Sequence, residues 1–224
     1  MGRSLTPTPP VSVGSTERTR VRRLPAKAVA ERSALNAVLD AGLVAHVSVV
    51  EQGQPYVLPV AFARDGERVL FHGSSGSRLF MALASGAQTC LTVTLLDGLV
   101  LARSAFESSM HYRSAMVIGT CVEMRGAAKR VALQLISEHL MPGRWAEIRE
   151  PSRKELAATS VLALPLAECS VKVSKGPPDD QEIDLDRAVW AGTVPIHESF
   201  GEPVDAPDLV NGVSVPTYVR RWER

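Results

Sequence analysis

Three β-rich runs that follow one another at short intervals constrain the fold of this chain more than any other feature. They cover residues 43–50, 55–63 and 68–72, and short polar segments at 51–54 and 65–66 separate them. Polar segments of this length that contain glycine and join apolar runs are typical of hairpins. The sequence therefore predicts antiparallel strands in this part of the chain.

More β-rich runs follow, and only three segments have the apolar spacing of helices. The later runs are 89–95, 99–105, 112–123, 161–166 and 170–174, and Asp97-Gly98 is predicted as the turn between the first two. The helical segments are 27–40, 77–83 and 127–140. Many strands with few helices predict a mostly β fold with flanking helices, and we expect a closed antiparallel barrel rather than a doubly wound parallel sheet.

Two local patterns predict how the first elements pack. Leu35, Val38 and Leu39 share one face of the first helical segment, so this helix should cover an apolar core. Gly42 suits the position that follows the last turn of that helix. Pro59 cannot donate to a sheet, so its strand should lie at an edge, at a bulge or where a ligand replaces a neighbouring strand.

Composition limits the class of protein. The chain has 224 residues, 45% of them hydrophobic, and a formal net charge of +1. It can form a core, and no strong field is present to attract nucleic acid or an anionic membrane. The polar, proline-rich start resembles neither a secretory signal nor a membrane span, so we expect a cytoplasmic protein. Three widely spaced cysteines argue against a disulfide framework.

The chain divides into three predicted parts. Residues 1–19 are rich in Pro, Ser and Thr without periodicity, and we expect them to be disordered. Residues 20–176 contain the predicted strands and helices and form the domain. Residues 177–224 are loop-like with isolated apolar residues at Trp190, Ile196 and Trp222, and we expect this extension to wrap the barrel or a partner subunit.

The junction at residues 69–80 carries the strongest chemical signal, because an apolar strand runs there into a Gly/Ser loop that opens a helix. The loop residues are Gly73, Ser74, Ser75, Gly76 and Ser77. Glycines permit positive φ and close backbone approach, hydroxyls can donate, and the first amides of a helix lack acceptors within it. With Arg78 at the helix start, the junction predicts a site for one phosphate group. The alternative is an ordinary polar turn.

The sequence gives weaker support for a catalytic histidine, a metal site or a nucleophile. His72 ends the strand that feeds the loop, so its imidazole either reaches a ligand held there or only makes a local hydrogen bond. His46, His139 and His197 have no acidic or cysteine partner at metal-ligand spacing, and no metal site is predicted. The loop lacks the patterns of a nucleophile elbow, a dinucleotide-binding turn and a triphosphate-binding loop.

Three blocks taken together resemble the pyridoxamine 5′-phosphate oxidase-like flavin-binding split barrels. They are residues 55–60 (PYVLPV), residues 70–78 (LFHGSSGSR) and residues 110–114 (MHYRS) with Gly119. The resemblance spans about residues 20–175, and it is greatest to the branch that includes the Nim-type nitroimidazole reductases. It implies that FMN lies in a groove at a homodimer interface, beside the backbone of Leu58, Pro59 and Val60.

The resemblance also assigns side chains to the cofactor. His72 and Gly73 fall where the strand end of the family meets the flavin, and Arg113 and Ser114 match a later strand position that touches the ring or the phosphate. Ser77 and Arg78 fall where the phosphate-binding residues of the family lie, and the loop residues Ser74 and Ser75 are further candidates for the cofactor from the loop pattern itself. In the Nim-type proteins a histidine at the place of His72 is associated with the active site, so His72 is the catalytic candidate.

Two departures from the family pattern limit which of the family's reactions we expect of this chain. Leu79 stands where the family members that oxidise pyridoxamine phosphate carry a second basic residue. The chain end at 218–222 also lacks the Arg-x-His motif of those oxidases. Oxidation of pyridoxamine phosphate is therefore not expected. We expect an FMN-dependent oxidoreductase that reduces a small organic molecule such as a nitro compound, with NADH or NADPH as the reductant. The alternative is a non-catalytic carrier or sensor that binds flavin, deazaflavin (coenzyme F420) or haem.

Overall fold

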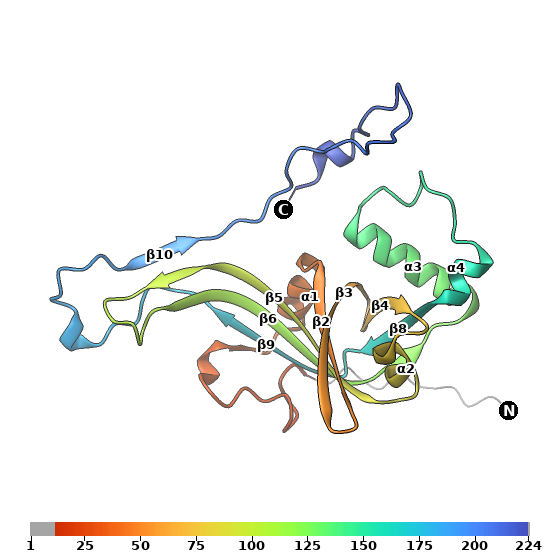
Figure 1. Cartoon of the computed structure of the whole chain (residues 1–224). Coiled ribbons are helices and arrows are strands. Elements are labelled where there is room, and N and C mark those ends of the chain that lie inside the picture. The colour runs from red at the N-terminus through yellow and green to blue at the C-terminus, as the bar shows by residue number, and fades with distance from the viewer. Residues whose placement is uncertain (1–11, 224) are drawn as a thin grey trace.

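The computed structural model describes residues 12–223. Figure 1 shows a long curved sheet with most of the helices at one end and a C-terminal segment that runs back above the sheet. The strands are β1 (Ala28–Val29), β2 (Val44–Glu51), β3 (Gln54–Asp65), β4 (Arg68–Ser74), β5 (Gln88–Leu101), β6 (Ser109–Thr120), β7 (Val122–Glu123), β8 (Thr159–Pro165), β9 (Glu168–Ser174) and β10 (Gly192–Pro195).

The helices are few and short. They are α1 (Arg32–Ala41), α2 (Arg78–Ala84), α3 (Gly126–Leu140) and α4 (Arg153–Ala158), with short 3₁₀ helices at Pro25–Lys27, Glu182–Asp184 and Val219–Arg221. None of the helices between residues 12 and 223 is long and apolar enough to cross a membrane.

The strand order is β1-β9-β6-β5-β2-β3-β4-β8-β7, with β10 added alongside β5, and the pairings are antiparallel. The mostly β fold with flanking helices is confirmed. The expectation of a closed barrel is corrected, because β1 and β7 end this order and do not pair with each other. The division arises in β3, where residues 54–61 pair with β2 and residues 62–65 pair with β4. The fold is an antiparallel split β-barrel.

The turn predicted at Asp97-Gly98 does not form. β5 continues through this point, and its register with β6 shifts between Leu96 and Gly98, so Asp97 is the extra residue of a β-bulge. At Gly98 a Cβ atom would lie 2.8 Å from the carbonyl oxygen of Val194 in β10, so the residue must be small. The two predicted strands are one, and β5 and β6 together form a long arm (Figure 1).

Helix α1 covers the core as predicted. The side chains of Leu35, Val38 and Leu39 are at most 1% exposed. Gly42 follows the helix with φ −76°, which is not left-handed, and it is small because a Cβ atom would lie 2.4 Å from Cγ1 of Val93. The helix begins later than predicted, at Arg32, because residues 28–29 pair with β9 instead.

Part of the N-terminal segment predicted to be disordered packs on the barrel. Val13 and Thr19 are buried, and the Gly14 amide donates to the carbonyl oxygen of Cys169 at 2.7 Å. Residues 1–11 of that segment lie outside the described residues. The domain boundaries stay a prediction.

The first part of the extension is fastened to the arm. Asp180, whose side chain is 3% exposed, accepts hydrogen bonds from the backbone amide and Nη1 of Arg103 at 2.6 and 2.7 Å. β10 then pairs with residues 98–101 of β5, and the Ile196 amide donates to the carbonyl oxygen of Asp97 at 3.0 Å. The extension therefore follows β5 back toward the helices.

The last part of the extension reaches α3. Nε1 of Trp222 donates to the carbonyl oxygen of Pro142 at 3.0 Å, and its ring packs against Phe200 and Tyr218 with centroids 5.7 and 6.0 Å apart. Trp190, in contrast, is 65% exposed in the single chain. Two of the three apolar residues noted in the sequence, Ile196 and Trp222, are thus partly buried, and one is not.

We expect Gly73→Ala to destabilise the fold. Its Cβ atom would lie 2.2 Å from Cε2 of Phe80, whose ring is buried and packs against Phe71 with centroids 5.8 Å apart. Overpacking of this kind costs about 1–3 kcal/mol, measurable as a loss in the free energy of unfolding in urea.

Gly76→Ala is the matched control in the same loop. The nearest atom to its added Cβ is Oγ of Ser74 at 3.8 Å, and its φ is not positive. Its free energy of unfolding should change by less than about 0.5 kcal/mol. Equal losses in the two variants would contradict the steric explanation.

Candidate functional site

The first two thirds of β3 have one open edge. Residues 54–61 pair with β2 on one side, and no strand of the described chain pairs with them on the other, because β4 begins its pairing at Phe62. Pro59 lies within this stretch, opposite His46. The expectation that Pro59 lies at an edge is confirmed, and the backbone of residues 54–61 has one open side.

Arg78 lies beside this edge. Its guanidinium carbon is 4.8 Å from the centroid of the Tyr56 ring, and its Nη1 is 3.3 Å from the Tyr56 hydroxyl. Its Nε is 3.7 Å from Oε2 of Glu51, and the Arg78 side chain is 65% exposed. An exposed ion pair of this kind is worth only about 0.2–1 kcal/mol. The guanidinium is therefore held by an aromatic face and is open to an anion.

The Gly/Ser loop is already hydrogen-bonded within the protein. The amide of Ser75 donates to the carbonyl oxygen of Ala158 at 2.8 Å, that of Gly76 to Oγ of Ser74 at 3.3 Å, and that of Ser77 to the carbonyl oxygen of Ser74 at 3.0 Å. Neither glycine of the loop has a positive φ. The prediction that the amides of the loop hold a phosphate is therefore corrected for Ser75 and Gly76. The amides that a helix leaves open are those of its first turn, here in α2.

His72 and Gly73 are neighbours on β4 and so face opposite sides of the sheet. Gly73 faces the ring of Phe80, whereas His72 lines a cavity of about 400 Å³ with Trp145 and Thr159. None of the residues 73–78 lines this cavity. The structure therefore separates the imidazole from the loop with which the sequence grouped it.

Burial of the His72 ring changes the pH at which it takes up a proton. The desolvation of the ring lowers its pKa below the ordinary value of a histidine. The imidazole is therefore neutral near pH 7, with one nitrogen able to donate and one able to accept a hydrogen bond.

Arg113 lies apart from both the β3 edge with Arg78 and the cavity that His72 lines. Its Nη2 is 2.7 Å from Oδ1 and its Nε is 2.9 Å from Oδ2 of Asp97, and these hydrogen bonds raise the pKa of the guanidinium. Both residues line a cavity of about 620 Å³ between the ends of α1 and α3, β5 and the extension. Ser114 faces the other side of the sheet, where it is paired with Thr94 and Lys172.

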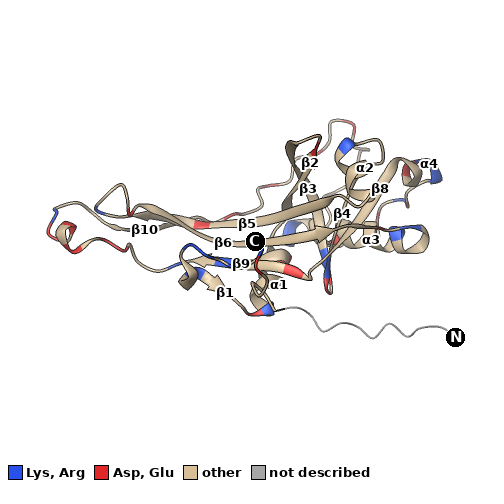
Figure 2. Cartoon of the chain, turned by 90° about the horizontal axis from the view of Figure 1, so that it is seen from below, with Lys and Arg blue, Asp and Glu red and all other residues tan. Residues whose placement is uncertain are grey.

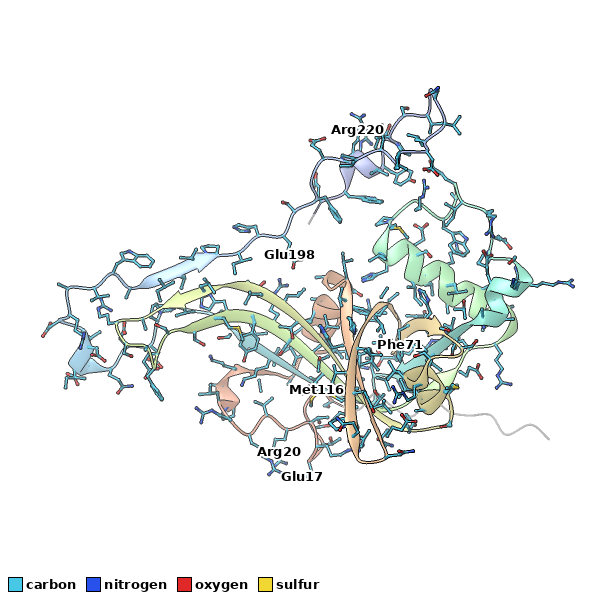
Figure 3. All side chains as sticks on the ribbon, in the orientation of Figure 1. Glu17, Arg20, Phe71, Met116, Glu198 and Arg220 are labelled. Atoms are coloured by element: carbon cyan, nitrogen blue, oxygen red, sulfur yellow. The ribbon has the colours of Figure 1, made fainter. Side chains whose placement is uncertain are left out.

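The extension forms the roof of this larger cavity. The lining combines apolar and charged side chains. The apolar ones are Leu43, Leu95, Leu96, Leu140, Pro142, Ile196, Phe200 and Trp222, and the charged ones are Asp40, Asp97, Arg113, Glu198, Arg221 and Glu223. Two imidazoles also line it, those of His139 and His197. Figure 3 shows the side chain of Glu198, another lining residue, directed from the extension toward the barrel. The cavity therefore exists only because the extension returns to the barrel.

One chain thus does not gather the predicted residues into one site. The β3 edge with Arg78, the cavity of His72 and the cavity of Arg113 are three separate places. Sequence analysis missed Tyr56 and Glu51 as partners of Arg78, and no local signal marks them, since the contact depends on how β3 lies against α2. It also interpreted Asp97 as a turn residue and so missed the partner of Arg113.

Several apolar side chains on β2, β3 and the arm are exposed in the single chain. They are Val44, Val50, Val57, Leu58, Leu96, Leu99, Leu101 and Met110. Figure 2 shows that the ribbons of β5 and β6 carry little charge. Asp97 and Arg113 are the acidic and basic residues of these two strands, and they pair with each other.

Comparison with known proteins gives one family and several solved structures. The family model of pyridoxamine 5′-phosphate oxidase matches residues 31–173. The FAD and haem binding protein from Mycobacterium smegmatis is 43% identical, with a TM-score of 0.83 over 87% of this chain and 96% of that chain. The flavocytochrome Anf3 from Azotobacter vinelandii is 39% identical, with a TM-score of 0.88 over 94% of this chain and 98% of that chain.

A more distant structure shares the fold alone. It is a protein from Bacteroides thetaiotaomicron named for resistance to 5-nitroimidazole antibiotics, 21% identical, with a TM-score of 0.55 over 65% of this chain and 86% of that chain. No curated protein matches the chain. The matches to the two more similar structures cover 87% and 94% of this chain, so each leaves fewer residues unmatched than the extension at 177–224 contains. Part of the extension therefore belongs to the structure that they share with this chain.

The buried His72 leads us to expect a pH dependence of stability. Because its pKa is lowered in the folded chain, the unfolded chain binds a proton more readily, and stability rises with pH between the two pKa values. The contribution is fully present above about pH 6.5, the ordinary value, and is lost as the pH falls from there through the folded pKa. Urea unfolding at about pH 7.5 and about pH 5.5 measures this decline.

The variant His72→Gln should decline less over this range, since Gln does not titrate. His46→Gln is the matched control, because His46 is an exposed histidine on β2. A decline in His72→Gln as steep as in the parent would mean that another group causes it.

Proposed function

Because the chain belongs to the pyridoxamine 5′-phosphate oxidase family, we propose that it is a flavin-binding redox protein. The observation that supports this most directly is the open edge of β3 with Arg78 beside it. The polar edge of a flavin ring suits the open backbone edge of β3 around Pro59, and its phosphate suits the exposed guanidinium and the first turn of α2. When bound, a flavin supplies hydride or electron transfer.

The proposal covers FMN and FAD. The sequence predicts FMN, whereas the Mycobacterium smegmatis relative is named for FAD. Both nucleotides carry a phosphate on the ribityl chain, so the role of Arg78 applies to either. Extraction of the cofactor and chromatography identify which one is bound.

We further propose that the chain binds haem. Both similar structures are named for it, one as a FAD and haem binding protein and the other as a flavocytochrome. The supporting feature of this chain is the cavity of about 620 Å³ under the extension, which apolar side chains and two imidazoles line together with charged residues. NADH or NADPH is the expected electron source, and a small organic molecule such as a nitro compound is the expected acceptor. The alternative function is a carrier or sensor without turnover.

We propose that the active form is a homodimer. Exposed apolar side chains on β2, β3 and the arm support this proposal, because a second copy would cover them, and so does the exposed Trp190. Arg78 and Arg113 lie apart in one chain, although the family pattern assigns both to one flavin. A second copy supplies the missing side chain if the sites lie between subunits.

One experiment tests the flavin, haem and homodimer proposals together. Purified protein is incubated with FMN, FAD and haemin and passed over a sizing column with light-scattering and absorbance detectors. We expect about twice the chain mass of 24.1 kDa, with flavin and haem absorbance in the same peak. Anaerobic NADH or NADPH should then bleach the flavin bands, and a nitro compound should restore them.

Three outcomes of this experiment would contradict or change the proposals. A protein that retains no flavin refutes the main proposal, and a monomer with its cofactors bound refutes the dimer. A coloured protein that neither reductant bleaches favours the carrier or sensor.

We expect Arg78→Ala to weaken FMN binding about ten- to a hundred-fold, because a lost charge-assisted hydrogen bond costs roughly 1.5–3 kcal/mol. Fluorescence titration measures the affinity. Riboflavin, which lacks the phosphate, should bind parent and variant alike. Arg130→Ala is the matched control, since Arg130 is also half-exposed and paired with a surface glutamate, Glu150. Equal weakening of FMN and riboflavin would assign Arg78 to the fold or to the ring.

A further inference from the structure

A short segment between α3 and α4 contacts two parts of the molecule. This linking segment, residues 141–152, forms neither helix nor strand. Four of its residues line the cavity of His72, and they are Trp145, Ile148, Arg149 and Pro151. Three others, Pro142, Gly143 and Glu147, line a groove with Tyr218 and Trp222 of the extension. The linking segment is therefore shared by the His72 cavity and the last part of the extension.

The last part of the extension holds this segment by aromatic side chains. The Tyr218 hydroxyl donates to Oε2 of Glu147 at 2.7 Å, and the Tyr218 ring lies over Gly143, where an added Cβ atom would be 3.2 Å from the ring. Nε1 of Trp222 donates to the carbonyl oxygen of Pro142 at 3.0 Å, and the rings of Trp222 and Tyr218 have centroids 6.0 Å apart. Two packed aromatic residues thus keep one side of the segment in place.

The linking segment is also attached to the helices on either side of it. The Glu138 carboxylate in α3 accepts hydrogen bonds from the amides of Gly143 and Trp145 at 2.8 and 2.9 Å. Toward α4, Nη2 of Arg149 is 2.5 Å from Oε1 of Glu155, and this ion pair is exposed, so it adds little stability. Gly143 and Trp145 lie close together in the chain and share the Glu138 carboxylate. A shift of Gly143 would therefore move Trp145, on the cavity side, as well.

From these contacts we propose that the last part of the extension sets the shape of the His72 cavity, and that Tyr218 is the residue that positions its wall. The linking segment supplies the apolar side chains of Trp145, Ile148 and Pro151 to the lining, and these exclude water from the imidazole. Whatever displaces Tyr218 would loosen the segment and open the cavity to water. The inference depends on contacts within the chain and not on which cofactor it binds.

His72 can report on the state of its cavity. Burial lowers the pKa of its imidazole, and the charged groups that line the cavity with it, Arg149 and Glu155, pair with each other. Because this pairing leaves little net charge beside the ring, the pKa follows the burial of the ring. Entry of water should raise this pKa toward the ordinary value of about 6.5. It should also expose the ring to reagents that modify imidazoles.

The test compares Tyr218→Ala with Trp190→Ala in the full-length protein. Trp190 is the matched control, because it is an aromatic residue of the same extension, is 65% exposed and lines neither the cavity nor the groove. NMR titration of histidine-labelled protein measures the pKa of His72, whose signal the variant His72→Gln identifies. Mass spectrometry measures how fast diethyl pyrocarbonate modifies His72, with the exposed His46 as the internal reference.

We expect Tyr218→Ala to raise the pKa of His72 and to speed its modification about threefold or more, and Trp190→Ala to change neither. An unchanged His72 in Tyr218→Ala overturns the inference, and so does an equal change in Trp190→Ala, since the extension as a whole would then be responsible. Should Tyr218→Ala speed the modification of His46 as well, the whole fold has loosened. Tyr218→Phe, which keeps the ring over Gly143 and loses only the hydroxyl, then takes its place in the same comparison.

Discussion

The change of pairing partner within β3 is the constraint on which the rest of the structure depends. Between Ala61 and Phe62 the strand passes from β2 to β4, so neither neighbour follows it along its whole length. The two parts of the sheet can then separate, and residues 54–61 keep an open edge. Backbone groups at such an edge need water or a ligand. The fold therefore places open hydrogen-bonding groups at the point where the barrel divides.

The predictions that succeeded depended on properties local to a few residues. Proline lacks an amide hydrogen wherever it is placed, so Pro59 predicts a strand with an open edge without knowledge of the neighbouring strands. The apolar face formed by Leu35, Val38 and Leu39 follows from helical spacing alone. For the same reason the hairpins at the start of the chain and the mostly β class were predictable.

The predictions that failed depended on contacts between distant segments. Asp97-Gly98 has the composition of a turn, but pairing with β6 and β10 on either side of the strand keeps it extended, and the surplus residue becomes a bulge. The amides of the Gly/Ser loop were expected to be open, but Ala158 at the end of α4 accepts one of them. Neither partner can be identified from the local pattern, because each joins the site only after the chain has folded.

The bulge at Asp97 also changes the phase of the side chains along β5. Before it the buried residues are the odd-numbered Leu91 and Val93, and after it the buried residue is Val100, while Leu99 and Leu101 are exposed. The arm therefore follows its own alternation, offset by one from that of the barrel. One consequence is that odd-numbered side chains of β5 face the core in the barrel, whereas odd-numbered side chains of the same strand face outward on the arm.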